Sequence, residues 1–268
     1  MKSISIQCPA KINMTLKVVG KRDDGFHNIE SIMQTIDLYD YLYISMIQSD
    51  RTKISLRGNS DTIPYDKTNL VYKAAKLYLD ANGLKNFEFD INIEKHIPVS
   101  AGLAGGSTDA AGTLYALNKF FDNRMSQDEL LNLCAQLGSD LNFCLIGGRA
   151  LTKGRGEIIE PKEHREININ LIKPLDIGIS AREAYTSFAE KTELEGDNRF
   201  NRRDYVNDLE WAIIDKYPTL QQIKKQYKTA VMTGSGSTYF STKEEFIPAE
   251  DFWVENGHKT IPYGVQMI

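Results

Sequence analysis

Alternating apolar and polar positions predict that the first hundred residues are rich in β-strands. Residues 3–8 and 12–19 both alternate, with Pro9-Ala10 as an interruption between them, and residues 87–94 show the same pattern. A period of two residues is typical of a strand that buries one face. Three further strands are predicted from the chain between them, at about 30–36, 41–47 and 53–57.

Apolar residues spaced three and four positions apart predict two helices in this half of the chain. The first covers 69–82, where Asn69 provides a cap at the N-terminal end. The second follows a glycine-rich stretch and has Leu114, Leu117 and Phe121 on one face. Ser107 or Thr108 is the expected cap of this second helix.

Two capping boxes mark further helix starts. Ser126 with Glu129 opens a helix at 127–137, and Ser180 with Glu183 opens a short helix that carries Tyr185. Because the pattern of elements restarts near residue 160, we place a domain boundary there. The remaining predictions are a strand at 167–173, an exposed polar loop at 190–204, helices at 206–215 and 219–227, and a strand at 229–232.

Composition excludes several classes of protein. With 268 residues, 41% hydrophobic and 25% charged, the chain can form a globular core. Its net charge of −4 gives no general attraction to nucleic acid or to a membrane surface. We find no apolar run long enough for a signal peptide or a membrane span, and we expect a cytoplasmic protein. Cys8, Cys134 and Cys144 lack metal-site spacing and are interpreted as structural thiols.

The stretch from Ile97 to Ala111, IPVSAGLAGGSTDAA, is the strongest candidate for a phosphate-binding loop. Gly102, Gly105 and Gly106 lie between a predicted strand and a predicted helix, where free backbone N–H groups and the helix dipole favour an anion. A tight structural turn is the alternative interpretation. The spacing fits neither the G-x-x-x-x-G-K-[ST] loop nor the G-x-G-x-x-G loop, so a different kind of phosphate loop is needed.

Several further segments accompany this loop in a fixed order. They are Pro9-Ala10-Lys11-Ile12-Asn13, Asp24-Gly25-Phe26-His27, Gly138-Ser139-Asp140-Leu141-Asn142-Phe143 and a second glycine loop, Thr233-Gly-Ser-Gly-Ser-Thr238. Together with 97–111 they resemble the motifs of the GHMP kinases, a family of small-molecule kinases. The segments at 9–13, 24–27 and 138–143 are most similar to the branch whose acceptor is 4-diphosphocytidyl-2-C-methyl-D-erythritol.

This resemblance implies a two-domain α+β fold. The N-terminal half, 1–160, would be like ribosomal protein S5 domain 2 and would bind ATP, and the C-terminal half, 161–268, would be ferredoxin-like. The active site would lie in the cleft between them. The implied partners are small molecules, ATP with Mg²⁺ and the cytidine diphosphate-linked methylerythritol, with no nucleic acid and no membrane. We expect a monomer or a weak homodimer.

The resemblance also implies a role for each matching residue. Asp140 would take a proton from the 2-hydroxyl of the acceptor, and Lys11 would keep Asp140 ionised and stabilise the transferring phosphoryl group. No metal ligand is assigned. The implied ATP-binding residues are Asn69, Pro98, Val99, Ser100, Ala101, Gly102, Leu103, Ala104, Gly105, Gly106, Ser107 and Thr108. The implied acceptor-binding residues are Asn13, Phe26, His27, Tyr185, Gly234, Ser235 and Gly236, of which Phe26 and Tyr185 would enclose the cytosine.

Two other functions stay open at the level of sequence. One is a GHMP kinase for a smaller alcohol, of the homoserine or mevalonate type, although such acceptors have no base to stack on Phe26 or Tyr185. The other is a pseudokinase that senses its nucleotide without turnover. Leu141-Asn142 stands where the branch has Val-Pro, which removes a backbone constraint beside Asp140. Ala181 stands where many relatives have Thr, and the resemblance implies that one hydrogen bond is missing there.

Overall fold

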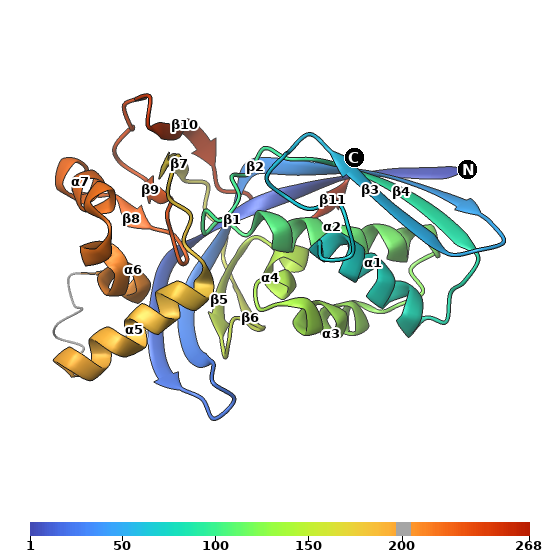
Figure 1. Cartoon of the computed structure of the whole chain (residues 1–268), viewed down its shortest axis with the longest axis horizontal. Helices are drawn as coiled ribbons and strands as arrows, with labels where there is room; N and C mark the ends of the chain where they lie inside the picture. The colour runs from blue at the N-terminus through green and yellow to red at the C-terminus, as the bar shows by residue number, and fades with distance from the viewer. Residues whose placement is uncertain (197–204) are drawn as a thin grey trace.

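The two longest strands of the molecule form an antiparallel pair at the centre of the first sheet (Figure 1). The computed structural model describes residues 1–196 and 205–268. In these residues the first sheet has the order β11-β1-β2-β4-β3, and β5 pairs with β2 and with β6. Its strands are β1 (Lys2–Lys21), β2 (His27–Gln48), β3 (Lys53–Gly58), β4 (Phe87–Glu94), β5 (Arg149–Lys153), β6 (Ile158–Lys162) and β11 (Gln266–Met267).

The predicted break at Pro9-Ala10 is wrong, because β1 continues through it to Lys21. The chain instead accommodates the proline by an irregular register, in which Pro9 pairs with Tyr39 but Lys11 pairs with Thr35. The two strands predicted at 30–36 and 41–47 are parts of one strand, β2, on either side of this irregularity. The shift releases the backbone N–H of Lys11, which donates to Leu103 O at 3.1 Å.

Four helices cover one face of the first sheet and bury the main core against it (Figure 1). The cap at Asn69 and the capping box of Ser126 with Glu129 are confirmed. The predicted cap by Ser107 or Thr108 is wrong, since the helix starts earlier and both residues lie inside it. The helices are α1 (Leu70–Ala81), α2 (Gly105–Phe120), α3 (Gln127–Leu137) and the unpredicted α4 (Leu141–Ile146).

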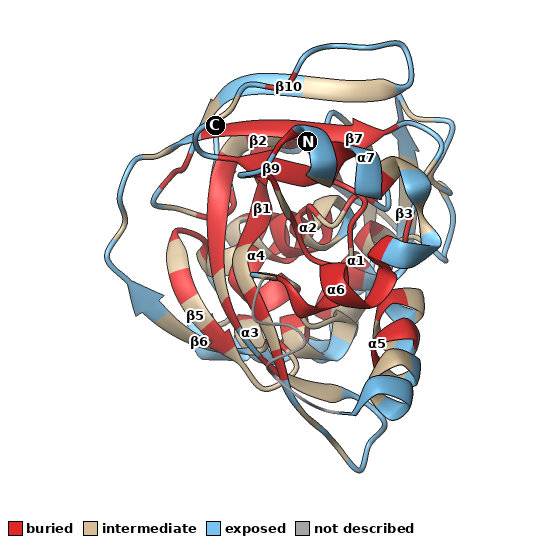
Figure 2. Cartoon of the chain, turned by 90° about the vertical axis from the view of Figure 1, so that its left-hand side faces the viewer, coloured by how far each residue is buried: buried red, intermediate tan, exposed pale blue. Residues whose placement is uncertain are grey.

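The second sheet has the order β10-β7-β9-β8 and belongs to the later part of the chain. It packs with three helices around a separate core, and Figure 2 shows buried residues concentrated on β7, β9 and α6. Its strands are β7 (Asn168–Pro174), β8 (Val231–Met232), β9 (Tyr239–Ser241) and β10 (Phe252–Lys259). Its helices are α5 (Ala181–Glu195), α6 (Asp208–Ile213), the 3-10 turn η2 (Ile214–Lys216) and α7 (Pro218–Gln226).

Helix α5 is longer than predicted and changes the interpretation of the polar segment. The first residues of the predicted loop at 190–204 are helical up to Glu195. Residues 197–204 of that prediction lie outside the described residues. Because the exposed side of a helix is also polar, charge alone did not distinguish helix from loop here.

The two halves are joined by shared strands. Leu16 and Val18, near the end of β1, pack in the core of the second half. In the other direction β11 returns to pair with Ile6 and Gln7 of β1. The boundary near residue 160 falls within β6, and the division into 1–160 and 161–268 remains our proposal. No helix of the described residues combines the length and the apolar character that a membrane span needs.

Candidate active site

A cleft of about 1210 Å³ lies where the two halves meet. Its walls come from β1, from the loop before α2, from the start of α4 and from α5. Lys11 and Asp140 line it together with both glycine loops. The segments that the sequence analysis selected separately are therefore brought to one place.

Lys11 is held at the bottom of this cleft by three oxygen atoms. Its Nζ donates to Asn13 Oδ1 at 2.7 Å and to Gly102 O at 3.0 Å, and it lies 3.5 Å from Asp140 Oδ2. Only 3% of the Lys11 side chain is exposed, whereas 33% of the Asp140 side chain is. The ammonium group is thus fixed, while the carboxylate remains accessible to a ligand.

Asp140 occupies the N-cap position of α4, directly after the end of α3. The dipole at the C-terminus of α3 disfavours a carboxylate here, whereas the dipole at the N-terminus of α4 favours one at the same place. Asp140 O accepts from Cys144 N at 3.0 Å, and Leu141 is buried in the main core. Helix packing therefore fixes the backbone that a proline would otherwise constrain.

The glycine loop before α2 has the backbone of an anion site. Ser100 and Ala104 have positive φ angles of 53° and 60°, a conformation that non-glycine residues rarely adopt without a reason in the surroundings. Ala104 provides no side-chain cap. The N–H groups of the first turn of α2 are left free of a side-chain acceptor and are available to phosphate oxygens.

The two glycine loops contact each other. Gly102 has a φ of +73°, and a Cβ atom there would lie 2.2 Å from Thr233 O. The Thr233 hydroxyl donates to Gly102 O at 3.3 Å and accepts from Asn13 N at 2.9 Å. A residue larger than glycine at 102 would push the loops apart, so the close contact requires glycine.

The other end of the cleft carries an aromatic group. His27 and Tyr185 are stacked, with centroids 5.3 Å apart and an interplanar angle of 14°. Phe26 is 51% exposed, and the Arg155 guanidinium lies 5.0 Å from its ring centroid.

Burial, with a smaller effect of the nearby Lys21, lowers the pKa of His27, so its imidazole is neutral at pH 7. Burial, with a further contribution from Asp140, raises the pKa of the Tyr185 phenol well above its usual value.

The GHMP kinases N terminal domain model matches residues 69–148, which contain the glycine loop and Asp140. The chain is 38% identical over 266 residues to a 4-diphosphocytidyl-2-C-methyl-D-erythritol kinase of Clostridium botulinum (strain Alaska E43 / Type E3), covering 92% of this chain and 93% of that one. A protein of the same name from Caldicellulosiruptor saccharolyticus is 40% identical over 250 residues, covering 86% and 85%.

The chain belongs to the 4-diphosphocytidyl-2-C-methyl-D-erythritol kinase family. A crystal structure of a 4-(cytidine 5'-diphospho)-2C-methyl-D-erythritol kinase superposes with a TM-score of 0.74 at 28% identity, covering 96% of this chain and 99% of that one. The mevalonate kinase of Methanococcus jannaschii has the same fold, with a TM-score of 0.68 at 16% identity, covering 97% and 99%. The predicted α+β GHMP kinase fold is confirmed.

Most of the residues selected by this family resemblance line the cleft. Leu103, Thr108 and Gly236 do not. Leu103 and Thr108 are buried, and Leu103 acts through its backbone, as the acceptor for Lys11 N. Asn69 lines the cleft, and its side chain also accepts from Val71 N at 2.8 Å as a helix cap.

Sequence reasoning for this family missed several cleft residues. They are Lys21, Lys95, Asp109, Arg155, Ile179 and Arg182. Asp109 lies within the 97–111 stretch, and Arg155 lies within Gly154-Arg155-Gly156-Glu157, which also resembles the family, but neither was given a role. The other four side chains reach the cleft through tertiary packing, so no local pattern indicated them.

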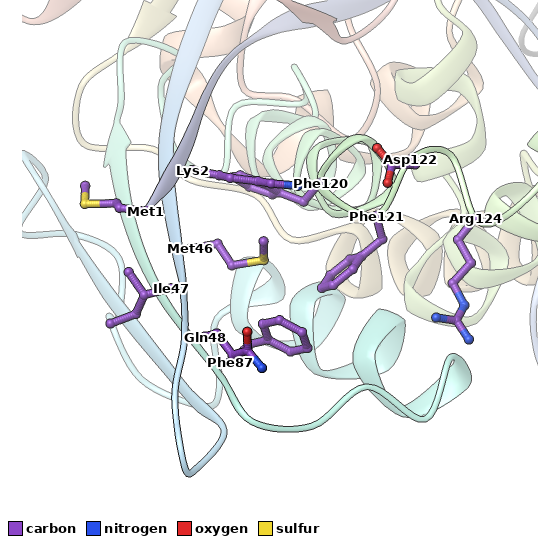
Figure 3. A pocket seen from close by; sticks show the side chains of 10 residues that line it. All are labelled: Met1, Lys2, Met46, Ile47, Gln48, Phe87, Phe120, Phe121, Asp122 and Arg124. Atoms are coloured by element: carbon purple, nitrogen blue, oxygen red, sulfur yellow. The ribbon is translucent and has the colours of Figure 1, made fainter.

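A smaller cavity of about 430 Å³ lies near the N-terminus (Figure 3). Its ten lining side chains include Met46, Phe87, Phe120 and Phe121, and Figure 3 shows Arg124 at its edge. It contains none of the family motifs. Among residues 1–196 and 205–268, no group of three or more His, Cys, Asp or Glu side chains is arranged to hold a metal ion.

Proposed function

We propose that this protein transfers the γ-phosphoryl group of ATP to the 2-hydroxyl of 4-diphosphocytidyl-2-C-methyl-D-erythritol. The reaction belongs to the non-mevalonate (methylerythritol phosphate) route to isoprenoid precursors. The observation that carries the proposal is the pair Lys11 Nζ and Asp140 Oδ2, 3.5 Å apart in a cleft with a phosphate-type loop at one end and an aromatic group at the other. The protein is thus a phosphotransferase with an alcohol as acceptor.

The nucleotide binds at the end of the cleft that includes Asn69 and the loop at 98–108. Free N–H groups at the start of α2 bind the triphosphate, and the apolar side chains around Asn69, such as Leu70 and Ile63, contact the adenine. Mg²⁺ arrives as part of the substrate, in complex with the ATP phosphates. A protein that receives the metal in this way needs few carboxylate ligands of its own.

The acceptor binds at the opposite end, with its base against the aromatic side chains. Tyr185 offers a ring that is already ordered by its stack on His27, and Phe26 lies on an accessible turn. A neutral His27 can donate or accept a hydrogen bond at the base edge. Arg155 and Lys21 place positive charge in the same part of the cleft, which suits a diphosphate.

The chemical step uses Asp140 as the base and Lys11 as the electrostatic stabiliser. The acceptor hydroxyl oxygen attacks the γ-phosphorus, its proton passes to a carboxylate oxygen of Asp140, and the bond to the β–γ bridging oxygen breaks to release ADP. Lys11, held by Asn13 and Gly102, keeps a positive charge beside the transferring group. The protein acts in the cytoplasm as a monomer or weak homodimer.

The alternatives are supported less well. A kinase for homoserine or a mevalonate derivative has no need for the Tyr185–His27 stack or for Arg155 above Phe26. The pseudokinase hypothesis relied on a loose backbone at 141–142, but Leu141 is buried and α4 starts there.

Replacement of Asp140 by Asn tests the proposal directly. Asp140→Asn keeps the size and removes the basicity, so kcat for acceptor-dependent ADP production should fall by roughly two to four orders of magnitude. The dissociation constants of ATP and acceptor should change far less. Near wild-type turnover in a folded Asp140→Asn protein would exclude the base role.

A further inference from the structure

Three ionisable side chains with no part in the proposed chemical step are buried together behind the glycine loop that precedes α2, which we call the nucleotide loop. Lys95, just after β4, donates from Nζ to Asp40 Oδ2 of β2 and, at 2.9 Å, to Asp109 Oδ2 of α2. At most 6% of each side chain is exposed. We call these three residues the Lys95 cluster. Lys95 and Asp109 both line the cleft.

The Lys95 cluster contacts the nucleotide loop at its start, middle and end. Asp40 Oδ1 accepts from His96 N at 2.7 Å and Ile97 N at 2.9 Å, where the loop begins. In the middle of the loop, a Cβ atom added at Gly105 would lie 2.9 Å from Lys95 Nζ and 3.3 Å from Asp40 Oδ2. At the end, the second carboxyl of the cluster belongs to α2 itself. The position of the free N–H groups therefore depends on this cluster.

The charge of the cluster is not balanced when both carboxyls are ionised. One ammonium and two carboxylates then leave a net charge of −1 in the wall that faces the triphosphate. Asp109 Oδ1 is buried and has no hydrogen-bond partner among the described residues. Two carboxyl groups as close as Asp109 and Asp40 can hydrogen-bond each other only when one of them carries a proton.

Other groups around Asp109 do not supply the missing charge. Burial raises the pKa of Asp109 to about 7, with Lys95 opposing the shift and Asp40 adding to it. Asp109 interacts electrostatically with two buried thiols, Cys8 of β1 and Cys144 of α4. Burial raises the pKa of both thiols well above their usual value, so they stay neutral. A single proton on the carboxyl pair is therefore the state that makes the cluster neutral.

We propose that Asp40, Lys95 and Asp109 are positioning residues for the triphosphate, and that ATP binds tightly only when the carboxyl pair holds one proton. This rests on the proposed function, in which ATP occupies the loop at 98–108. Loss of the proton places a negative charge behind the phosphates and sets two carboxylates against each other between β2 and α2. Both effects weaken ATP binding and leave the acceptor end of the cleft unaffected.

The test is the dissociation constant of a non-hydrolysable ATP analogue, with Mg²⁺ in excess, measured by calorimetry between pH 6.5 and 8.5. In wild type the protonated fraction falls as the pH rises through about 7, so the dissociation constant should rise severalfold across this range. In Asp109→Asn, which resembles the protonated form, this rise should disappear. Ionisation of the analogue itself affects all variants equally.

A control variant separates this effect from loss of stability. Tyr78→Phe removes a buried hydrogen bond of 3.0 Å between Tyr78 of α1 and Asn118 of α2, the helix that carries Asp109, and it should lower stability without changing the pH profile of ATP binding. Lys95→Met, which leaves the carboxyls uncompensated, should weaken ATP binding at every pH. An equal pH slope in wild type and Asp109→Asn overturns the inference. No binding of the analogue to wild type at any pH would instead contradict the proposed function.

Discussion

At the scale of single residues, Lys11 and Asp140 form one unit. Lys11 has three oxygen partners and little freedom to turn, so its charge is available only at the position where Asp140 meets the acceptor. Such an arrangement is expected to show strong coupling between the two side chains. This coupling can be measured independently of any assumption about the acceptor's pose.

We predict that Lys11→Met lowers kcat, because the transferring phosphoryl group loses its nearest positive charge. The double variant with Asp140→Asn should be barely slower than the slower single variant, since residues that act as a unit are not additive. Rates from single-turnover kinetics give the comparison. Additive losses, with each substitution multiplying the other, would show that the two residues act separately.

Tyr185 carries a second prediction at this scale. Tyr185→Ala should weaken acceptor binding by roughly 1–3 kcal/mol, the usual contribution of stacking on a base, with little change in ATP binding. Tyr115→Ala, which removes an aromatic ring of α2 outside the cleft, is the matched control. If an acceptor analogue without cytosine loses as much affinity as the acceptor, Tyr185 does not hold the base.

At the scale of elements, substitution of two neighbouring glycines in the glycine loop is expected to affect different properties of the protein. Gly105 is the obvious target from sequence, but a side chain there would contact Lys95, Asp40 and Ile97 inside the protein. Gly106 lines the cleft, and its Cβ position has only Leu70 Cδ1 within 4 Å, at 3.8 Å. A side chain at 106 therefore has room in the fold and occupies the nucleotide space.

We predict that Gly106→Val abolishes measurable ATP binding while the protein stays folded, because the added methyl groups obstruct the approach of the phosphates to the backbone. Gly105→Val should impair ATP binding and, unlike Gly106→Val, should also lower the melting temperature. Calorimetric titration with ATP and thermal unfolding of both variants check this. Unchanged ATP affinity in Gly106→Val would place the nucleotide elsewhere.

Long, regularly patterned elements could be predicted from the sequence, and short ones could not. The face of 69–82 and the capping box at Ser126 gave α1 and α3 within a residue or two. Helix α4, with only six residues, has too little periodicity to be recognised, so the favourable N-terminal dipole at Asp140 could not be predicted from the sequence. The β5–β6 hairpin was missed for the same reason.

At the scale of the whole molecule, the site is assembled from distant segments. Motif order brought Lys11, the 98–108 loop, Asp140 and the 233–238 loop into one hypothesis, and all of them meet at the cleft. Lys95 could not be found in this way, because its position depends on how the strands and loops pack. A resemblance identifies what relatives share, whereas packing determines the remaining lining residues.

The measurement that tests the central claim most directly is ADP release by the wild-type protein with MgATP and, in turn, 4-diphosphocytidyl-2-C-methyl-D-erythritol, homoserine and mevalonate. Phosphorus NMR of the product identifies the hydroxyl that receives the phosphoryl group. We predict turnover only with the cytidylyl acceptor, with the new phosphate on its 2-hydroxyl. Turnover with homoserine or mevalonate at an equal or greater rate, or no turnover although ATP and the acceptor both bind, would contradict the account.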